Sequence, residues 1–176
     1  MRIYTRRGDD GTTGLLHGGR VPKDSPLPTA YGTVDEAQAA LGLARAESDE
    51  ELDGVLVGLE RDLWVVMAEL ATNPERRADL TPGETLVTAE MVTRLEGLID
   101  DFSGRFEPPT EFVVPGQTRA AACLDLARTV VRRAERATLA AELPDSEVGP
   151  YLNRLSDLLW TLARWQEGQS LTTREG

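Results

Sequence analysis

Apolar residues recur every three or four positions along most of this chain, which is the period of amphipathic helices. Val34, Ala37, Leu41 and Ala44 show the period in the first such segment. The pattern predicts five helices, at about residues 28–48, 50–71, 86–103, 117–141 and 148–168. Because strand candidates are few, we expect these five helices to form an all-α bundle.

Two segments interrupt the helical pattern. The first is residues 5–19, TRRGDDGTTGLLHGG, where glycines alternate with polar residues, so we expect a flexible loop with neither helix nor regular strand. Its backbone N–H groups, hydroxyls and the cations Arg6 and Arg7 could wrap a polyphosphate, although it lacks the Walker pattern and a disordered tail is the alternative. The second is residues 107–116, EPPTEFVVPG. Its short apolar run, which begins at Phe112, is expected to plug the core between two helices.

The fourth helix is predicted to carry a charged face. The side chains that fall on this face are Arg128, Arg132, Glu135 and Arg136. Arginines four residues apart repel each other, and guanidinium is suited to bidentate phosphate binding, so a bound phosphate is one explanation of the face. The other is a salt-bridged face in which Glu135 pairs with Arg132 and Arg128.

Two further features have alternative interpretations. Asp35 is either a first-turn charge beside a capping box of Thr33 and Glu36, or a carboxylate that points inward and holds an arginine. On the fifth helix, a polar stripe with a tryptophan lies opposite the apolar face. It is either ordinary exposed surface or, as we expect, a surface that meets a second subunit or a ligand. The members of this stripe are Asn153, Asp157, Trp160 and Arg164.

The composition is acidic, with 30 acidic and 19 basic residues among 176 and a formal charge of −11. We expect one domain over residues 1–176, with a loop at 1–26 and a bundle at 27–170. No basic stripe extends over several elements, so neither nucleic acid nor a membrane is an expected partner. Cys123 and His17 cannot supply a metal cage, a disulfide or the histidines of a di-iron bundle. The chain shows no signal peptide and no apolar run of about 18 residues, which predicts a cytoplasmic protein.

Five motifs follow one another in a specific order: IYTRRGDDGTTGLL, AYGTVDEAQAALGLARA, FVVPGQT, RTVVRRAER and YLNRLSDLLWTLAR. In these motifs, over nearly its whole length, the chain resembles the PduO-type ATP:cob(I)alamin adenosyltransferases. The resemblance implies a five-helix bundle with a four-helix up-and-down core, in the ferritin-like fold of that family. It implies a homotrimer with active sites between subunits. It also implies transfer of the 5′-deoxyadenosyl group of ATP to the cobalt of cob(I)alamin, with release of triphosphate.

The resemblance implies roles for individual residues as well. The loop residues that would fold over ATP are Thr5, Arg6, Arg7, Gly8, Thr13, Gly14 and Lys23. The residues that would complete the nucleotide site from the helices are Arg132, Arg133, Ala134, Glu135, Arg136 and Asn153. Here Arg6 and Gly14 stand where the family usually has a lysine and a hydroxyl. Asp35 and Arg128 would pair across a subunit boundary, and Phe112 would close the lower face of the corrin.

The implied chemistry needs no general base, because Co(I) is itself a strong nucleophile. Arg132, a lysine and Mg²⁺ held through the ATP phosphates would stabilise the departing triphosphate. Phe112 would expel the lower ligand of cob(II)alamin, so that a reductase can supply the electron, and an adenosylcobalamin-dependent enzyme would use the product. Two alternatives are a non-catalytic ATP-binding regulator on the same bundle and a structural helical protein.

Overall fold

The computed structural model describes residues 4–174, which form five α-helices, one 3-10 helix and a two-stranded hairpin. The elements in chain order are β1 (Thr12–Gly14), β2 (Arg20–Pro22), α1 (Pro26–Arg45), α2 (Glu50–Leu70), η1 (Pro74–Asp79), α3 (Ala89–Ser103), α4 (Arg119–Leu139) and α5 (Val148–Glu167). The predicted all-α five-helix bundle is confirmed, and every predicted helix is present close to its expected bounds.

Local sequence signals explain where the helices begin and end. Asp49, Thr88 and Thr118 precede α2, α3 and α4, and each side chain accepts a hydrogen bond from an amide of the first turn. α1 begins at Pro26, since the missing N–H of proline needs no partner there. α5 ends at Gly168, whose φ of 68° lies in the left-handed region that favours glycine.

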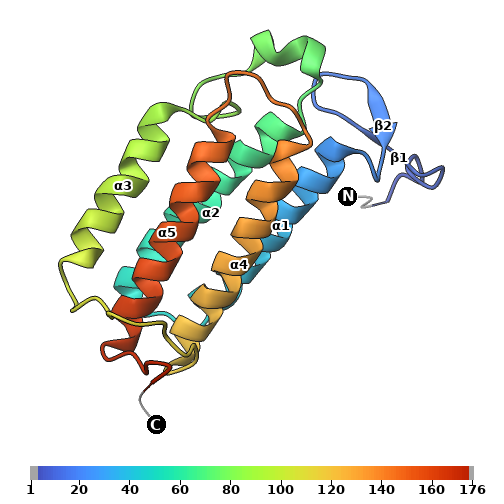
Figure 1. The fold of residues 1–176 in the computed structure, drawn as a ribbon. Helices are drawn as coiled ribbons and strands as arrows, with labels where there is room; N and C mark the ends of the chain where they lie inside the picture. Colours follow the sequence, from blue (N-terminus) through green and yellow to red (C-terminus); the bar gives the residue numbers. More distant parts are fainter. Residues whose placement is uncertain (1–3, 175–176) are drawn as a thin grey trace.

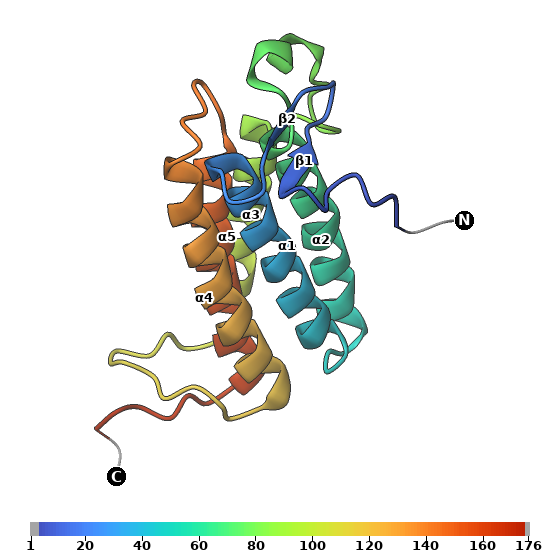
Figure 2. The same cartoon turned by 90° about the vertical axis from the view of Figure 1, so that its right-hand side faces the viewer.

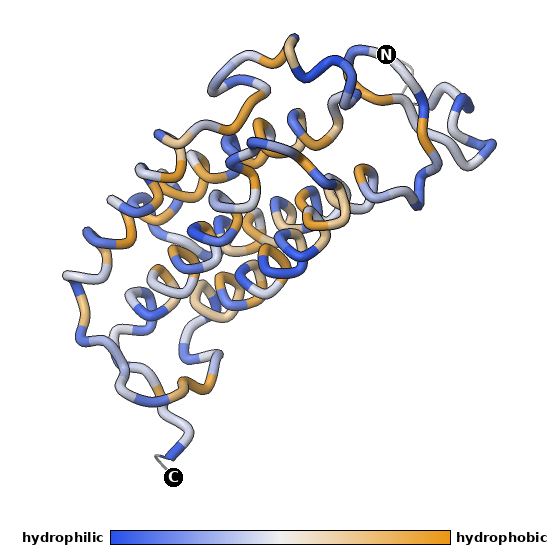
Figure 3. Tube along the Cα trace, turned by 45° about the horizontal axis from the view of Figure 1, so that its top comes forward, coloured by the Kyte–Doolittle hydropathy of each residue, from blue (hydrophilic) through white to orange (hydrophobic). Residues whose placement is uncertain are grey.

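Successive helices run in alternating directions along the bundle (Figure 1). α1 packs against α2 and α4, α4 packs against α5, and α3 lies on the outside against α5. Hydrophobic and hydrophilic residues alternate along each helix, as expected when one face is buried (Figure 3). Within residues 4–174, no helix combines the length and the apolar character needed to cross a membrane.

The core takes apolar side chains from all five helices. Representative fully buried residues, one from each helix, are Leu41, Leu63, Leu95, Leu124 and Leu155. Burial of one such side chain contributes about 1.5–3 kcal/mol. Packing of the apolar faces therefore stabilises these helices more than intrinsic helix propensity does.

The N-terminal segment contains a β-hairpin, so the expectation of no regular strand in residues 5–19 is wrong. Thr13 of β1 lies opposite Val21 of β2, and Gly14 lies opposite Arg20. The Arg20 guanidinium strengthens this pairing, because its Nη2 donates to Thr12 Oγ1 and to the Arg7 carbonyl, both at 2.7 Å. Strands of three residues are too short to show the two-residue period by which a strand is recognised in a sequence.

The hairpin is anchored to the end of α2 (Figure 2). The Leu16 amide donates to the Ala71 carbonyl at 2.8 Å, and the Asn73 amide donates to the Leu16 carbonyl at 3.1 Å. Asn73 Nδ2 also donates to the Gly18 carbonyl at 3.2 Å. Gly19 has a φ of 87°, and a Cβ there would lie 3.1 Å from Asn73 Nδ2, so this turn requires glycine.

A buried carboxylate, Glu69, joins three connecting segments at the same end of the bundle. Glu69 Oε1 accepts hydrogen bonds from Arg77 Nη2 at 2.9 Å and from Ser146 Oγ at 2.6 Å. Glu69 Oε2 accepts one from the Val87 amide at 2.8 Å. Because a buried charge is tolerated only when paired and hydrogen-bonded, this joint fixes the loops around η1, before α3 and between α4 and α5.

Candidate functional site

The segment that precedes β1 forms a polar hollow of about 540 Å³, lined by Tyr4, Thr5, Arg6 and Arg7. The Arg6 guanidinium lies 5.7 Å from the centre of the Tyr4 ring. Arg6 also has a φ of 61°, which is uncommon for a residue other than glycine. Three of the residues predicted to bind nucleotide, Thr5, Arg6 and Arg7, therefore line one concave surface.

Other predicted nucleotide-binding residues gather beside the hairpin. The Lys23 amino group lies 3.1 Å from the position that a Cβ on Gly8 would occupy, and the Lys23 amide donates to the Gly11 carbonyl at 2.9 Å. The structure thus brings Gly8 and Lys23 together, with Thr13 and Gly14 in the adjacent strand β1.

Asp10 holds the turn that leads into this hairpin. Its Oδ1 accepts hydrogen bonds from the Thr12 amide at 2.9 Å and the Thr12 hydroxyl at 2.8 Å. These two hydrogen bonds lower the pKa of Asp10 below its usual 3.8. Asp10 therefore stays ionised at neutral pH and fixes the backbone next to the predicted phosphate-binding residues.

The predicted arginine face (Arg128, Arg132, Glu135 and Arg136) is present on α4. Val131 and Ala134 on the opposite side are fully buried, while Arg132 and Arg136 are exposed. Among residues 4–174, neither Arg132 nor Arg136 forms an ion pair. Two cations one helical turn apart with no carboxylate partner leave a place for an anion on this face.

The other members of the predicted helix site have partners on neighbouring helices. Asn153 Nδ2 of α5 donates to Glu135 Oε1 at 3.1 Å, and Arg133 forms an ion pair with Glu36 of α1. Arg128 Nε contacts Asp125 Oδ1 at 3.1 Å. The alternative in which Glu135 neutralises Arg132 and Arg128 is therefore wrong.

Asp35 lies in the middle of α1, where it is exposed and, among the residues that the structure describes, has no ion-pair or hydrogen-bond partner. The capping-box interpretation is wrong, because α1 begins at Pro26 and the Thr33 hydroxyl donates to the Thr29 carbonyl. Asp35 borders a hollow of about 460 Å³, here called the Trp64 hollow. Its lining residues are Leu16, Tyr31, Gly32, Asp35, Trp64, Met67, Ala68 and Ala71.

Phe112 does not plug the core: 87% of it is exposed, so that expectation is wrong. It projects from the loop between α3 and α4 into an open hollow of about 620 Å³, here called the Phe112 hollow. The lining residues are Pro109, Thr110, Glu111, Phe112, Val113, Trp160, Thr173 and Arg174. A large exposed aromatic beside a second aromatic, Trp160, is a typical contact surface for a flat apolar ligand.

The Phe112 loop is held by the segment that follows α5. The Val114 amide donates to the Leu171 carbonyl at 2.8 Å, and the Thr173 amide donates to the Phe112 carbonyl at 2.9 Å. These two bonds form an isolated antiparallel bridge. The backbone of the loop is therefore fixed while the Phe112 ring stays exposed.

The predicted polar stripe of α5 is not one surface. Asp157 is exposed, Asn153 and Trp160 are half-buried, and Arg164 is only 2% exposed. Arg164 pairs instead with Asp125, which lies 39 residues away in the chain. A contact at that sequence distance leaves no trace in local spacing, which is why the stripe appeared to be exposed.

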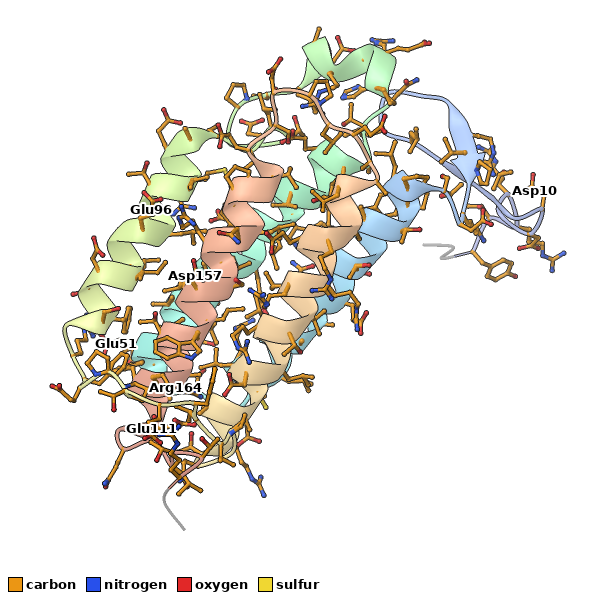
Figure 4. The ribbon with its side chains drawn as sticks, in the orientation of Figure 1. Asp10, Glu51, Glu96, Glu111, Asp157 and Arg164 are labelled. Carbon is orange, nitrogen blue, oxygen red and sulfur yellow. The ribbon has the colours of Figure 1, made fainter. Side chains whose placement is uncertain are left out.

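In one chain the predicted site residues fall into separate groups. Figure 4 shows Asp10 of the hairpin and Glu111 of the Phe112 loop at opposite ends of the bundle. Figure 2 shows the N-terminal segment leaving the bundle on the side of α2, away from α4. A single chain thus does not bring the loop, the arginine face and the Phe112 hollow into contact.

Several residues at these surfaces were not identified from the sequence. Arg20 ties the hairpin to the segment before it, and Thr173 and Arg174 line the Phe112 hollow. Trp64, which is 64% exposed, lines the Trp64 hollow together with Asp35. Only Trp64 carried a usable signal in the sequence, since it is a tryptophan that does not fall on the apolar face of α2.

Within the described residues, no cluster of three or more His, Cys, Asp or Glu side chains could hold a metal ion.

The chain is similar to known adenosyltransferases in sequence. The corrinoid adenosyltransferase PduO of Salmonella typhimurium is 42% identical over 174 residues, which cover 97% of this chain and 51% of that protein. A corrinoid adenosyltransferase of Citrobacter freundii is 42% identical over 171 residues, 94% of this chain and 95% of that protein. The chain therefore spans about half the length of the Salmonella PduO protein and nearly all of the second relative.

It is also similar in structure to solved members of this group. A variant of the PduO-type ATP:corrinoid adenosyltransferase from Lactobacillus reuteri, complexed with cobalamin and ATP, has a TM-score of 0.88 at 27% identity and covers 99% of this chain and 97% of that chain. Another variant, complexed with ATP, has a TM-score of 0.86 at 27% identity and covers 98% of this chain and 100% of that chain. The cobalamin adenosyltransferase family model matches residues 3–166. Taken with the bundle, the arginine face and the Phe112 hollow, these similarities mean that the chain belongs to the cobalamin adenosyltransferase family.

Proposed function

We propose that this chain transfers the 5′-deoxyadenosyl group of ATP to the cobalt of cob(I)alamin, giving adenosylcobalamin and triphosphate. The observation that carries the proposal is the Phe112 hollow, in which an exposed phenylalanine faces a cavity of about 620 Å³ that Trp160 also lines. Exposure of such a ring is unfavourable in water, so the hollow is suited to a flat apolar partner such as a corrin.

The reaction is a nucleophilic substitution at C5′ of ATP. The Co(I) electron pair forms the Co–C5′ bond, the bond from C5′ to the triphosphate oxygen breaks, and cobalt is oxidised to Co(III). Since cobalt is the nucleophile, the protein has to align C5′ with it and stabilise the charge that develops on the triphosphate. The guanidinium groups of Arg132 and Arg136, which have no ion-pair partner in the described part of the chain, are suited to the second task.

The nucleotide would lie between subunits. The loop residues Thr5–Arg7, with Gly8 and Lys23, belong to the N-terminal segment, which leaves the bundle on the side of α2, and they would reach the α4 of a neighbouring chain. Arg133, Glu135 and Asn153 would frame the same site on α4 and α5. Mg²⁺ would be bound through the ATP phosphates, because the described residues offer no carboxylate cluster for it.

The Asp35–Arg128 pair would form across the same boundary. Asp35 is exposed and has no partner among residues 4–174, and Arg128 is half-buried with one side bonded to Asp125. Two such boundary residues on different helices favour a closed ring, and we propose a homotrimer. We also propose that a reductase supplies the electron to cob(II)alamin and that an adenosylcobalamin-dependent enzyme takes the product. The proposed location of the protein is the cytoplasm.

The test is direct conversion. Purified protein, chemically reduced cobalamin and MgATP should give adenosylcobalamin, followed by its visible spectrum, together with an equal amount of triphosphate. The same protein with ATP alone should not release triphosphate. Tight ATP binding without product would favour the second candidate, a non-catalytic ATP-binding regulator, and would overturn the proposed activity.

A further inference from the structure

Arg164 is a buried cation at the end of α5 nearest the Phe112 loop (Figure 4). Its side chain is 2% exposed and contacts two buried carboxylates. Arg164 Nη2 donates to Asp125 Oδ2 at 2.5 Å and to Glu167 Oε1 at 3.1 Å. Arg164 Nε lies 3.1 Å from Glu167 Oε2 but without the angle of a hydrogen bond. A guanidinium can contact both carboxylates at once because its N–H groups form a planar fork.

The first carboxylate connects Arg164 to the subunit boundary. While Asp125 Oδ2 accepts from Arg164, Asp125 Oδ1 accepts from Arg128 Nε at 3.1 Å. The orientation of the Arg128 guanidinium therefore depends on a carboxylate that Arg164 holds in place.

The second carboxylate connects Arg164 to the Phe112 loop. Glu167 Oε2 accepts from the Ser170 hydroxyl at 2.8 Å, which fixes the chain just after α5. The next residue, Leu171, accepts the Val114 amide at 2.8 Å and so begins the backbone bridge that carries the Phe112 loop. The position of Phe112 therefore also depends on a carboxylate that Arg164 holds.

A third contact reaches the wall of the same hollow. The Arg164 guanidinium lies 5.8 Å from the centre of the Trp160 ring, and Trp160 lines the Phe112 hollow. Arg164, Arg128, Asp125 and Glu167 carry two positive and two negative charges, so the network is neutral as a whole. Removal of its central cation would leave two buried carboxylates that repel each other.

We propose that Arg164 is a positioning residue that holds Arg128 and the Phe112 loop in the relative orientation that the corrinoid site requires. This inference rests on the proposed function, since it names the residue that aligns the two parts of that same site. Arg164 does not touch the substrate. It acts through Asp125 on one side and through Glu167 on the other.

The test compares two lysine variants. Arg164→Lys keeps the charge but replaces the fork by a point donor, so it cannot hold both carboxylates in their present geometry. We expect its KM for cob(I)alamin to rise about tenfold or more, while its KM for ATP stays within about twofold, because only the corrinoid side is displaced. Arg45→Lys is the matched control: Arg45 also bridges two carboxylates, Asp53 and Glu60, but between α1 and α2. Both of its KM values should stay unchanged.

A binding measurement separates this inference from the proposed activity. Quenching of tryptophan fluorescence by cob(II)alamin, with ATP present, gives the corrinoid dissociation constant without turnover, and Arg164→Lys should weaken it by a similar factor. If Arg164→Lys does not fold, Glu167→Gln carries the test, because its amide oxygen can still accept from Ser170 while the ion pair is lost. Equal changes for ATP and corrinoid, or no change for corrinoid, would overturn the role of Arg164. An inactive wild-type chain would overturn the proposed activity, and the corrinoid dissociation constants would still decide the role of Arg164.

Discussion

At the scale of single residues, Phe112 is a large apolar side chain that stays exposed to water. Burial of a phenylalanine side chain is worth about 1.5–3 kcal/mol, yet this ring is exposed on a backbone that two hydrogen bonds hold in place. Natural sequences break such rules mainly at functional sites. The ring is thus available to a partner without any rearrangement of the core.

Phe112→Ala should impair the reduction of the corrinoid but not the transfer of the adenosyl group. We expect activity to be lost when the assay starts from cob(II)alamin with a reductant, because the lower ligand is no longer displaced. Activity should be largely retained from prereduced cob(I)alamin. The urea midpoint should hardly move, whereas loss of a core phenylalanine costs about 3–5 kcal/mol. Val114→Ala, in the same loop but outside the hollow, is the control, and equal losses in both assays would contradict the proposed role of Phe112.

At the scale of elements, three helices meet at one polar contact inside the bundle. The Tyr151 hydroxyl of α5 donates to Asp62 Oδ2 of α2 at 2.9 Å, and Arg94 of α3 pairs with the same carboxylate. Burial of the phenol, and then the neighbouring Asp62 charge, raise the pKa of Tyr151 well above its ordinary value of 10.0. The hydrogen bond that joins α5 to α2 at this contact therefore exists only while the phenol keeps its proton.

This shift predicts a loss of stability in alkali. Below pH 10.0 both the folded and the unfolded chain hold the Tyr151 proton, so pH has no effect through this group. Above that value only the unfolded chain releases it, and the free energy of unfolding should fall by about 1.4 kcal/mol per pH unit. Urea unfolding between about pH 9 and pH 11 should show a steeper decline for the wild type than for Tyr151→Phe. Identical slopes would mean that Tyr151 ionises as easily in the folded chain.

The elements also show what the sequence can and cannot predict. The helices follow from apolar periodicity, because each long helix repeats its buried face many times, as Leu52, Leu59 and Leu63 do in α2. The hairpin was missed because its strands of three residues repeat nothing and depend on the side chain of Arg20. Candidate site residues could be named from the family motifs, and their roles stay predictions. Their partners could not be named, since Asp125 and Arg164 meet only after α4 and α5 have packed.

At the scale of the whole molecule, several surfaces of one chain remain incomplete. The Trp64 hollow exposes apolar side chains, Asp35 lies at its edge, and the arginine face lies on another side of the bundle. Apolar hollows of this kind on a bundle commonly mark contacts with another subunit. The Trp64 hollow and the arginine face therefore both fit the proposed assembly of several chains.

We expect light scattering at micromolar concentration to give three times the mass of one chain. Trp64→Asp should shift the mass towards the monomer and abolish adenosyl transfer, because it places a charge in the Trp64 hollow. Circular dichroism should remain that of a helical bundle, since Trp64 is exposed and outside the core. A monomeric wild-type protein with full activity would contradict a site shared between chains.

The contacts of Glu69 affect the order in which parts of the chain can become structured during synthesis. Its partners arise from positions 8, 18 and 77 residues further along, so the Glu69 carboxylate emerges from the ribosome long before Ser146 can reach it. Arg77 and Val87 can contact it early, while the last hydrogen bond waits until the connection between α4 and α5 has been synthesised. The hairpin is anchored at Ala71 and Asn73, next to this joint. The end of the bundle that carries the hairpin is therefore among the last parts to become rigid during synthesis.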